Sequence, residues 1–334
     1  MCMSGKILTI SVAAYNVEKF INKCLDSFVE SGVIDDVEII VTDDGSKDNT
    51  PDIVKEYSLK YPTSIILVRQ ENAGPGSTVN SGISHASGKY FRMVDGDDWV
   101  NPTEFSKLVN KLKGIDCDAV IHNFCEVDNN TYEEVPHSVD NLPVNVSVHF
   151  CDIADRLSSV SMHNLVVKTE IMKDYVILDN CFYTDMQYLI FPIRYIKTVM
   201  YLDYYVYMYR VSLGTQSMNP KSMQKNIDMH TKVLFSLVNY FEDYRKSSDC
   251  NESVLCFLKN RINIMAGAQI FIYLSFKPSK HNKRNMFKFL STLEKSSKVL
   301  YNSFAKIKTV RVLNFCSLLY CPLSWMVRCK NKIK

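Results

Sequence analysis

Three carboxylates fall within four residues in the stretch MVDGDDWV, directly after an apolar run. Asp95, Asp97 and Asp98 repel one another, so this cluster lowers stability unless a cation lies beside it. Asp95 and Asp97 stand at i and i+2 at the end of an expected strand, so they can face the same side. Two carboxylates suit Mg²⁺ or Mn²⁺ and leave open coordination sites for a diphosphate. The stretch predicts a Mg²⁺ or Mn²⁺ site at Asp95 and Asp97; a solvated acidic turn capping a helix at 102–112 is the alternative.

Two other segments carry polar groups suited to a nucleotide. In VTDDGSKDNT, Asp43 and Asp44 end an apolar run, and an aspartate before Gly-Ser can accept a hydrogen bond from a base N–H or a ribose hydroxyl. A type I turn with a helix N-cap is the alternative there. In ENAGPGSTVNSG, glycines precede an expected helix, which suggests phosphate contact. This segment is neither G-x-G-x-x-G nor a Walker A sequence, so it does not support a nicotinamide enzyme.

Strand-like and helical segments alternate over the first 126 residues. Strands are expected at 7–16, 37–46, 64–72, 89–98 and 117–127, with helices between them at 17–30, 49–61, 77–86 and 101–112. Such alternation predicts βαβ units, a mostly parallel sheet and helices on both faces. Ligands of such sheets bind at the carboxyl ends of the strands. The polar residues at four of these ends are therefore expected to meet in one crevice: Tyr15, Asn16, Asp43, Asp44, Glu71, Asn72, Asp95, Asp97 and Asp98.

Beyond residue 126 the sequence pattern changes twice, first to an irregular polar segment and later to a helical composition. Residues 127–150 look irregular and polar, and a strand followed by a helix is expected at 162–172. A further strand at 201–211 alternates, with three tyrosines on one face. After Pro220 the composition becomes helical, with helices expected at 227–244, 254–276 and 285–304. We therefore expect an α/β domain over residues 1–220 and a helical C-terminal region over 221–334.

Four motifs, in their order and spacing, resemble those of the family 2 glycosyltransferases. They are VAAYN, VTDDGSKDNT, NAGPGSTVNSGISHASGKYFRMVDGDDW and CFYTDMQYL, and the resemblance runs from about residue 7 to residue 218. It implies the GT-A fold, a Rossmann-like, mostly parallel sheet with flanking helices. It also implies an inverting transferase that uses a nucleotide-diphosphate sugar and a divalent cation. On this basis residues 1–126 form the nucleotide-sugar half of the catalytic domain and residues 127–220 the acceptor half.

The resemblance assigns roles residue by residue. Asp95 and Asp97 correspond to the D-x-D pair at the ribose, diphosphate and metal, and Asp185 matches the catalytic base. The segment YRVSLGTQS matches one that closes over the diphosphate. Residues implied at the nucleotide-sugar are Ala14, Tyr15, Asn16, Asp43, Asp44, Asn72, Gly76, Asn80, Asp95 and Gly96. Two departures stand out: GSTVNSG lacks an arginine that the family often has there, and Thr184 replaces the glutamate before Asp185.

The chemistry agrees with a base from a separate segment. A sugar hydroxyl is a poor nucleophile and gains from a carboxylate that takes its proton. In-line attack inverts the anomeric centre, so the base must lie across the sugar from the metal. Asp185 stands some ninety residues beyond the acidic cluster and meets this requirement. A helix N-cap before Met186 is the alternative for the same residue.

A carboxylate at Asp43 can accept from N3–H of uracil or thymine, or from N1–H of guanine, whereas cytosine offers no N–H there. A UDP-sugar is the favoured donor, and CDP is disfavoured. The acceptor is expected to be a hydroxyl of a glycan or a lipid-linked molecule in surface polysaccharide synthesis, such as a capsule, by family analogy. A sugar nucleotidyltransferase is one rival, although SVAAYNVEKF lacks a basic, glycine-rich triphosphate loop. A non-catalytic nucleotide-sugar-binding partner subunit is the other.

Charge and cysteine usage limit the partners and the compartment. The net charge of +3 over 334 residues argues against a nucleic-acid binder. Eleven cysteines are scattered without a Cys-x-x-Cys pair, and no secretory signal is seen. Reduced thiols in a cytoplasmic protein are therefore expected.

The C-terminal segment 306–334 joins an apolar run to flanking basic residues. The run at 312–327 contains Pro322 and is too short to span a bilayer comfortably. Apolar residues between lysines and arginines predict a helix lying in the interface of an anionic membrane, at the inner face of the cell membrane. The alternative is packing on the catalytic domain or a homodimer contact through Leu313, Phe315, Leu318, Leu319 and Trp325.

Overall fold

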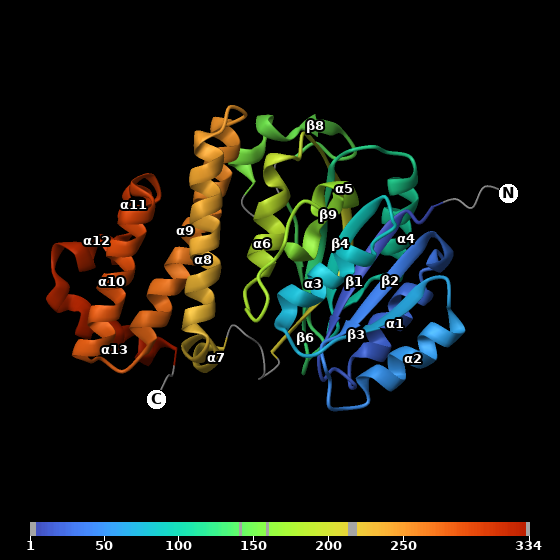
Figure 1. The fold of residues 1–334 in the computed structure, drawn as a ribbon, viewed down its shortest axis with the longest axis horizontal. Coiled ribbons are helices and arrows are strands. Elements are labelled where there is room, and N and C mark those ends of the chain that lie inside the picture. The colour runs from blue at the N-terminus through green and yellow to red at the C-terminus, as the bar shows by residue number, and fades with distance from the viewer. Residues whose placement is uncertain (1–4, 140–141, 158–159, 213–218, 332–334) are drawn as a thin grey trace. The chain divides into compact units, whose positions relative to one another are not determined.

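A computed structural model describes residues 5–139, 142–157, 160–212 and 219–331. The chain divides into two compact units, Met1–Leu213 and Gly214–Lys334 (Figure 1). The composition of the sequence placed this division at 220/221.

The first unit is built on a ten-stranded mixed sheet. Its strands are β1 (Leu8–Ala14), β2 (Val37–Asp43), β3 (Ile65–Arg69), β4 (Tyr90–Asp95), β5 (Trp99–Val100), β6 (Ala119–Asp128), β7 (Glu134–His137), β8 (Ser147–His149), β9 (Leu165–Lys168) and β10 (Thr198–Val211). The order is β3-β2-β1-β4-β9-β6-β10-β5, with β7 beside β6 and β8 beside β10. β3, β2, β1 and β4 run parallel, as predicted. β9 is antiparallel to both of its neighbours, so the second half of the sheet is mixed.

Helices cover both faces of this sheet (Figure 1). They are α1 (Ile21–Val29), α2 (Thr50–Lys60), α3 (Gly74–His85), α4 (Pro102–Lys113), α5 (Thr169–Met172) and α6 (Asp185–Ile190), with short 3₁₀ turns η1 (Ile34–Asp36), η2 (Phe150–Asp152), η3 (Ala154–Arg156), η4 (Met162–Asn164) and η5 (Phe191–Arg194). β2 and β3 lie on one side of β1 and β4 on the other, so right-handed crossovers put α3 on the opposite face from α1 and α2. The predicted α/β architecture is confirmed, and β1 and β2 are almost wholly buried because both faces are covered.

The segment at 127–150 differs from the irregular loop that was expected. β6 continues to Asp128, and β7 and β8 follow as short strands on β6 and β10. Most of their residues are exposed, so they lack the alternation of apolar and polar residues that marks a half-buried strand.

The second unit consists of helices in its described residues. They are α7 (Pro220–Lys225), α8 (Ile227–Lys246), α9 (Glu252–Ser275), α10 (Lys280–Ser296), α11 (Lys298–Phe304), α12 (Lys308–Phe315), the 3₁₀ turn η6 (Ser317–Leu319) and α13 (Tyr320–Lys330). α9 contacts α7, α8, α10, α11 and α13. The helix expected at 285–304 is divided at Ser297, whose hydroxyl accepts from the amide of Leu300 at 3.2 Å and caps α11.

The ten cysteines among the described residues are free thiols, as their scattered spacing predicted. Cys24, for example, is fully buried in the core of the first unit. It packs there as a small apolar side chain.

Candidate active site

The carboxyl ends of the parallel strands meet at one edge of the sheet. Ala14 in β1 lies opposite Asp43 in β2, and Ala13 lies opposite Asp95 in β4. Asp43 in turn lies opposite Arg69 in β3. The register therefore places Asp43 and Asp95 on either side of the end of β1, as the pattern of polar strand ends indicated.

A tight turn shapes the acidic cluster after β4. The amide of Asp98 donates to the carbonyl of Asp95 at 3.0 Å, and the amide of Gly96 donates to the carbonyl of Ala13 at 2.9 Å. A Cβ atom on Gly96 would lie only 2.8 Å from that carbonyl oxygen. Gly96 is therefore needed so that the turn can lie close to the end of β1.

The three carboxylates of this cluster have different partners. Asp95, Asp97 and Asp98 each bring a carboxylate oxygen within 4.8 Å of the others. Asp98 is 2% exposed, and its oxygens accept from the hydroxyl of Tyr207 at 2.6 Å and from the amide of Arg210 at 2.7 Å. Asp98 therefore ties the turn to β10, which leaves Asp95 and Asp97 as the pair suited to a cation.

Burial raises the pKa of each carboxyl group in the cluster. The pKa of Asp95 rises to about 7, first through burial and then through the negative charges of Asp97 and Asp185. Burial also raises the pKa of Asp97, although the charge of Arg210 works in the opposite direction. A divalent cation would offset this repulsion, and hard carboxylate oxygens suit Mg²⁺ or Mn²⁺. The residues present therefore fit the predicted metal.

Arg210 lies beside the cluster, and sequence reasoning missed it. Its Nε donates to the backbone carbonyl of Asp97 at 2.7 Å, and Nη1 donates to Oδ1 of Asn129 at 3.0 Å. Its guanidinium carbon lies 4.7 Å from the ring centroids of both Phe20 and Trp99. The sequence signal for Arg210 is its position in YRVSLGTQS, the segment that matches one closing over the diphosphate. Residues 213–217 of that segment lie outside the described residues.

Asp185 reaches the same edge from a different part of the chain. It is the first residue of α6, and Thr184 is the N-cap, so Asp185 is not itself the cap of this helix. Burial raises the pKa of Asp185, against hydrogen bonds from the first amides of the helix. The charge of Asp185 also contributes to the raised pKa of Asp95, so the two carboxyl groups interact electrostatically. The structure thus allows the charge of the predicted base to act on Asp95, while the role of Asp185 as the base stays a prediction.

Gly76 and Asn80 in α3 hold the segment that leads into α6. A Cβ atom on Gly76 would lie 2.0 Å from the carbonyl oxygen of Leu178. The Asn80 side chain accepts from the amide of Ile177 at 2.9 Å and donates to its carbonyl at 2.7 Å and to Asp179 at 3.1 Å. Both residues thus hold the segment at 177–179, which precedes α6, while their contact with the nucleotide-sugar stays a prediction.

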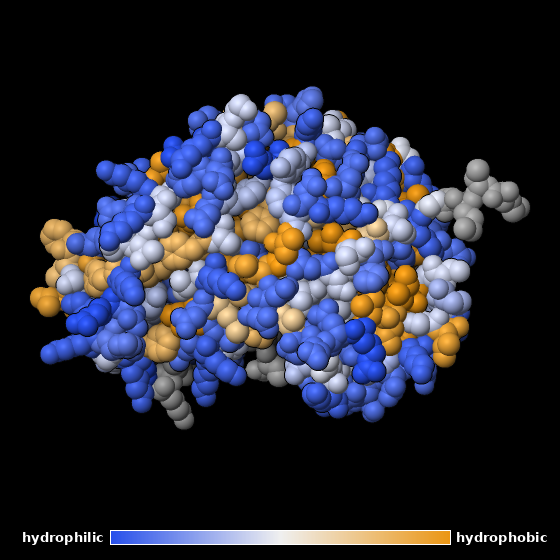
Figure 2. Space-filling view, in the orientation of Figure 1, coloured by the Kyte–Doolittle hydropathy of each residue, from blue (hydrophilic) through white to orange (hydrophobic). Residues whose placement is uncertain are grey.

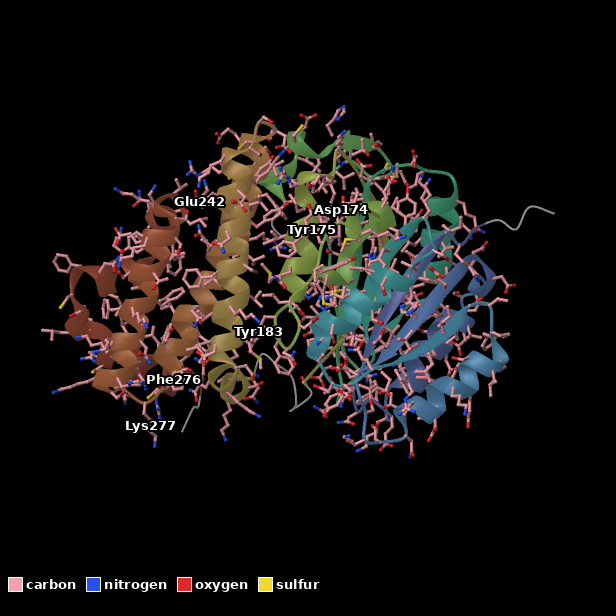
Figure 3. All side chains as sticks on the ribbon, viewed as in Figure 1. Asp174, Tyr175, Tyr183, Glu242, Phe276 and Lys277 are labelled. Carbon is pink, nitrogen blue, oxygen red and sulfur yellow. The ribbon has the colours of Figure 1, made fainter. Side chains whose placement is uncertain are left out.

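Tyr183, which is labelled in Figure 3, lies two residues before α6 begins at Asp185. Its φ of 68° lies in the left-handed region, which costs a non-glycine residue about 1–3 kcal/mol. Burial and the charge of Asp185 raise the pKa of its hydroxyl. A strained aromatic residue two positions before the predicted base is a feature that the sequence pattern did not single out.

Asp44 organises the loop between β3 and α3. Its Oδ1 accepts from Nε2 of Gln70 at 2.7 Å and from the amide of Ala73 at 2.9 Å, and Oδ2 accepts from the amide of Gly74 at 2.9 Å. The side-chain amide of Asn72 donates to the backbone carbonyl of Asp44 at 2.9 Å. Asp44 and Asn72 therefore fix the shape of the glycine-rich loop.

Asp43 is the carboxylate at the end of β2, and its contact with the nucleoside stays a prediction. It is buried, and its oxygens lie 3.1 Å from the amide of Ser46 and 3.4 Å from Nε of Arg69. Nearby, Asn16 has a φ of 53° and joins the loops after β1 and β2 through bonds to Ser46 and Lys47.

Two further residues predicted at the nucleotide-sugar are Ala14, which ends β1, and Tyr15, which follows it. Tyr15 keeps 49% of its surface exposed, so its ring is available to a ligand. The carbonyl of Ala14 accepts from the amide of Asp44 at 2.9 Å, which links the ends of β1 and β2. The strand ends thus form a connected rim along the edge that carries the acidic cluster.

Known proteins share parts of this sequence. Residues 9–176 match the family model described as Glycosyl transferase family 2. The chain is 36% identical over 124 residues to the glycosyltransferase GlyA of Streptococcus pneumoniae, covering 37% of this chain and 17% of that protein. It is 37% identical over 122 residues to the poly(ribitol-phosphate) beta-glucosyltransferase of Bacillus spizizenii, covering 32% and 19%. The chain thus spans less than a fifth of the length of these two relatives.

Solved structures show the same fold. S. aureus TarS 1–349 in complex with UDP-GlcNAc superposes with a TM-score of 0.64 at 16% identity, over 98% of this chain and 91% of that chain. The predicted GT-A fold with a helical C-terminal region is confirmed.

Proposed function

Because the chain belongs to glycosyl transferase family 2, we propose that it is an inverting glycosyltransferase acting on a nucleotide-diphosphate sugar. The sugar passes to a hydroxyl of a glycan or a lipid-linked acceptor, in the synthesis of a surface polysaccharide. The relatives support this class, since one is a minor teichoic acid biosynthesis protein and another a poly(ribitol-phosphate) beta-glucosyltransferase. The observation that carries the proposal is the cluster of Asp95, Asp97 and Asp98 after β4, together with Asp185 at the start of α6, whose charge acts on Asp95.

Asp185 serves as the general base. It comes from α6, whereas the acidic cluster follows β4, so base and diphosphate site are supplied by separate segments. A carboxylate at this position takes the proton of the acceptor hydroxyl as the oxygen attacks the anomeric carbon, an effect typically worth about 10²–10⁴-fold in rate. Its raised pKa strengthens it as a base.

Asp95 and Asp97 hold a divalent cation, Mg²⁺ or Mn²⁺. When bound, such a cation stabilises the negative charge that gathers on the leaving nucleoside diphosphate. Asp98 keeps the turn in place through Tyr207 and Arg210, so the two ligands keep their geometry without the cation.

The donor nucleotide is UDP. The Asp43 carboxylate accepts from N3–H of uracil, and the exposed ring of Tyr15 covers the nucleoside. UDP-GlcNAc in the structure of TarS, which has the same fold, supports a UDP-sugar here. The glycine-rich segment GSTVNSG lacks the arginine that the family resemblance implies there, which favours a non-catalytic nucleotide-sugar-binding subunit as the second candidate.

A donor panel separates the two candidates. UDP-, GDP-, dTDP- and CDP-sugars are each incubated with the protein and Mn²⁺ or EDTA, and release of the nucleoside diphosphate is followed. We expect metal-dependent release from a UDP-sugar, with water as the acceptor. A protein that binds UDP with Mn²⁺ in calorimetry yet releases none from any donor, with or without a glycan acceptor mixture, is instead the binding subunit.

A further inference from the structure

Large apolar side chains are exposed at the end of the second unit. Phe315, Leu318, Trp325 and Met326 are 93%, 77%, 66% and 58% exposed, and all lie within α12, η6 and α13. In Figure 2 apolar surface gathers over the connection between α12 and α13. Exposed apolar groups that cluster in this way mark an interaction surface, whereas scattered ones do not.

The opposite face of the same segment is firmly packed. Val310 and Leu313 are buried, and the hydroxyl of Ser324 donates to the carbonyl of Phe276 at 2.9 Å. Tyr320 is also buried. The exposed residues are therefore the outer face of a folded element. Of the five residues named by the packing or dimer alternative, only Leu313 is fully buried.

Basic residues precede and follow this outer face in the sequence. From Lys295 to the end of the chain the sequence contains no acidic residue. The basic residues in that stretch that the structure describes are Lys295, Lys298, Lys306, Lys308, Arg311, Arg328 and Lys330. Aromatic and aliphatic side chains beside lysine and arginine are the composition of an element that lies in the headgroup region of an anionic bilayer.

The residues of α12, η6 and α13 do not fit a segment that crosses the bilayer. Among the described residues, no single helix has the length and apolar character of a membrane span; only α12 together with η6 and α13 reaches them, with a 120° bend between. Spanning would also expose the Ser324 and Tyr320 contacts with the rest of the second unit. An element fixed on its inner face can instead insert its outer side chains to a shallow depth.

We propose that the outer face of α12, η6 and α13 docks on the surface of an anionic lipid membrane. A second copy of the chain is the less favoured occupant, because two copies of this face would bring like charges together. The membrane places the enzyme beside a lipid-linked acceptor, but the docking itself does not depend on the proposed activity.

The two tryptophans allow a direct test. Trp99 is 8% exposed in the first unit, so Trp99→Phe leaves Trp325 as the sole reporter. With phosphatidylglycerol vesicles at low salt we expect a blue shift of its emission and co-sedimentation of the protein. Phosphatidylcholine vesicles should give at least tenfold weaker binding. The matched variant Trp325→Phe, which reports only from Trp99, should show no shift.

Two sets of variants test how much the apolar side chains and the basic side chains each contribute to vesicle binding. Phe315→Ser with Leu318→Ser, and Lys306→Gln with Lys308→Gln and Arg311→Gln, should each lower the vesicle partition coefficient at least tenfold. As a control, Leu59→Ser removes a 74% exposed leucine from α2 and should leave the vesicle partition coefficient unchanged. Thermal unfolding checks that every variant is folded. Intact protein that stays in the supernatant overturns the proposal. So does a blue shift that appears without vesicles as protein concentration and measured mass rise together, which would identify a dimer.

Discussion

The hydroxyl of Tyr207 donates a 2.6 Å hydrogen bond to Oδ2 of Asp98. This bond joins β10 to the turn after β4, and it engages one of three clustered carboxylates with a neutral partner. The other oxygen of Asp98 is taken by the amide of Arg210. The acidic cluster therefore contains one structural carboxylate and two that are suited to a ligand, a distinction that D-G-D-D alone does not reveal.

Tyr207→Phe should lower the free energy of unfolding by about 1–3 kcal/mol, because Asp98 keeps its burial and loses a strong hydrogen bond. Urea unfolding monitored by circular dichroism measures the change. Tyr204→Phe, on the same strand and partly exposed, is the control and should change stability little. Equal effects of the two substitutions would show that the bond to Asp98 is not a significant stabilising contact.

Asp97→Asn should abolish metal-dependent UDP binding and leave thermal stability unchanged or higher, since it removes like-charge repulsion. Asp98→Asn is the matched substitution one residue further on. It should destabilise the protein, because an amide cannot accept at both oxygens from Tyr207 and Arg210. Calorimetric titration of UDP with Mn²⁺ and thermal unfolding separate the two effects. Asp97→Asn activity that persists in EDTA would rule out the metal role.

The stability of the metal-free protein should depend on Asp95. Its folded pKa of about 7 lies above the value of about 3.9 in an unfolded chain, so the folded state binds more protons between these values. The free energy of unfolding should therefore fall as pH rises from about 4 to about 7. Urea unfolding in EDTA across this range tests it, and Asp95→Asn should show a shallower fall. An identical pH profile for this variant would contradict the assignment.

Nucleotide selectivity tests Asp43. UDP should bind more tightly than CDP, because cytosine offers no N–H at the position where uracil does. Competition calorimetry in Mn²⁺ compares the two, and Asp43→Asn should narrow the difference. Asp44 is a poor control, since its oxygens hold the loop at 70–74. Equal affinity of the native protein for CDP and UDP would exclude Asp43 as the reader of the base.

Much of the site follows from local patterns. Apolar runs ending in acids predicted the strand ends, and parallel register then brings Asp43 and Asp95 to either side of β1. The short strands β7 and β8 were missed because they are exposed and carry no alternation. The sheet is mixed beyond β4 because β9 enters antiparallel, and no short-range signal marks that direction.

Long-range contacts account for what the sequence did not reveal. Tyr207 and Arg210 join the cluster across more than a hundred residues, so nothing near MVDGDDWV indicates them. The sequence predicts contact of Gly76 and Asn80 with the nucleotide-sugar. It does not indicate that both also contact the segment at 177–179, about a hundred residues further on. A motif gives residue types and order, whereas these roles depend on tertiary packing.

The central claim is that Asp185 acts as the base while other residues hold the donor. Asp185→Asn should therefore keep nearly normal UDP affinity in Mn²⁺ calorimetry and lose about 10²–10⁴-fold of the release rate from the preferred UDP-sugar under single-turnover conditions. Asp179→Asn and Glu170→Gln, two nearby carboxylates in the same region of the chain, are the controls and should retain the rate. A wild-type rate for Asp185→Asn, with the loss appearing instead in one of these two variants, would contradict the account.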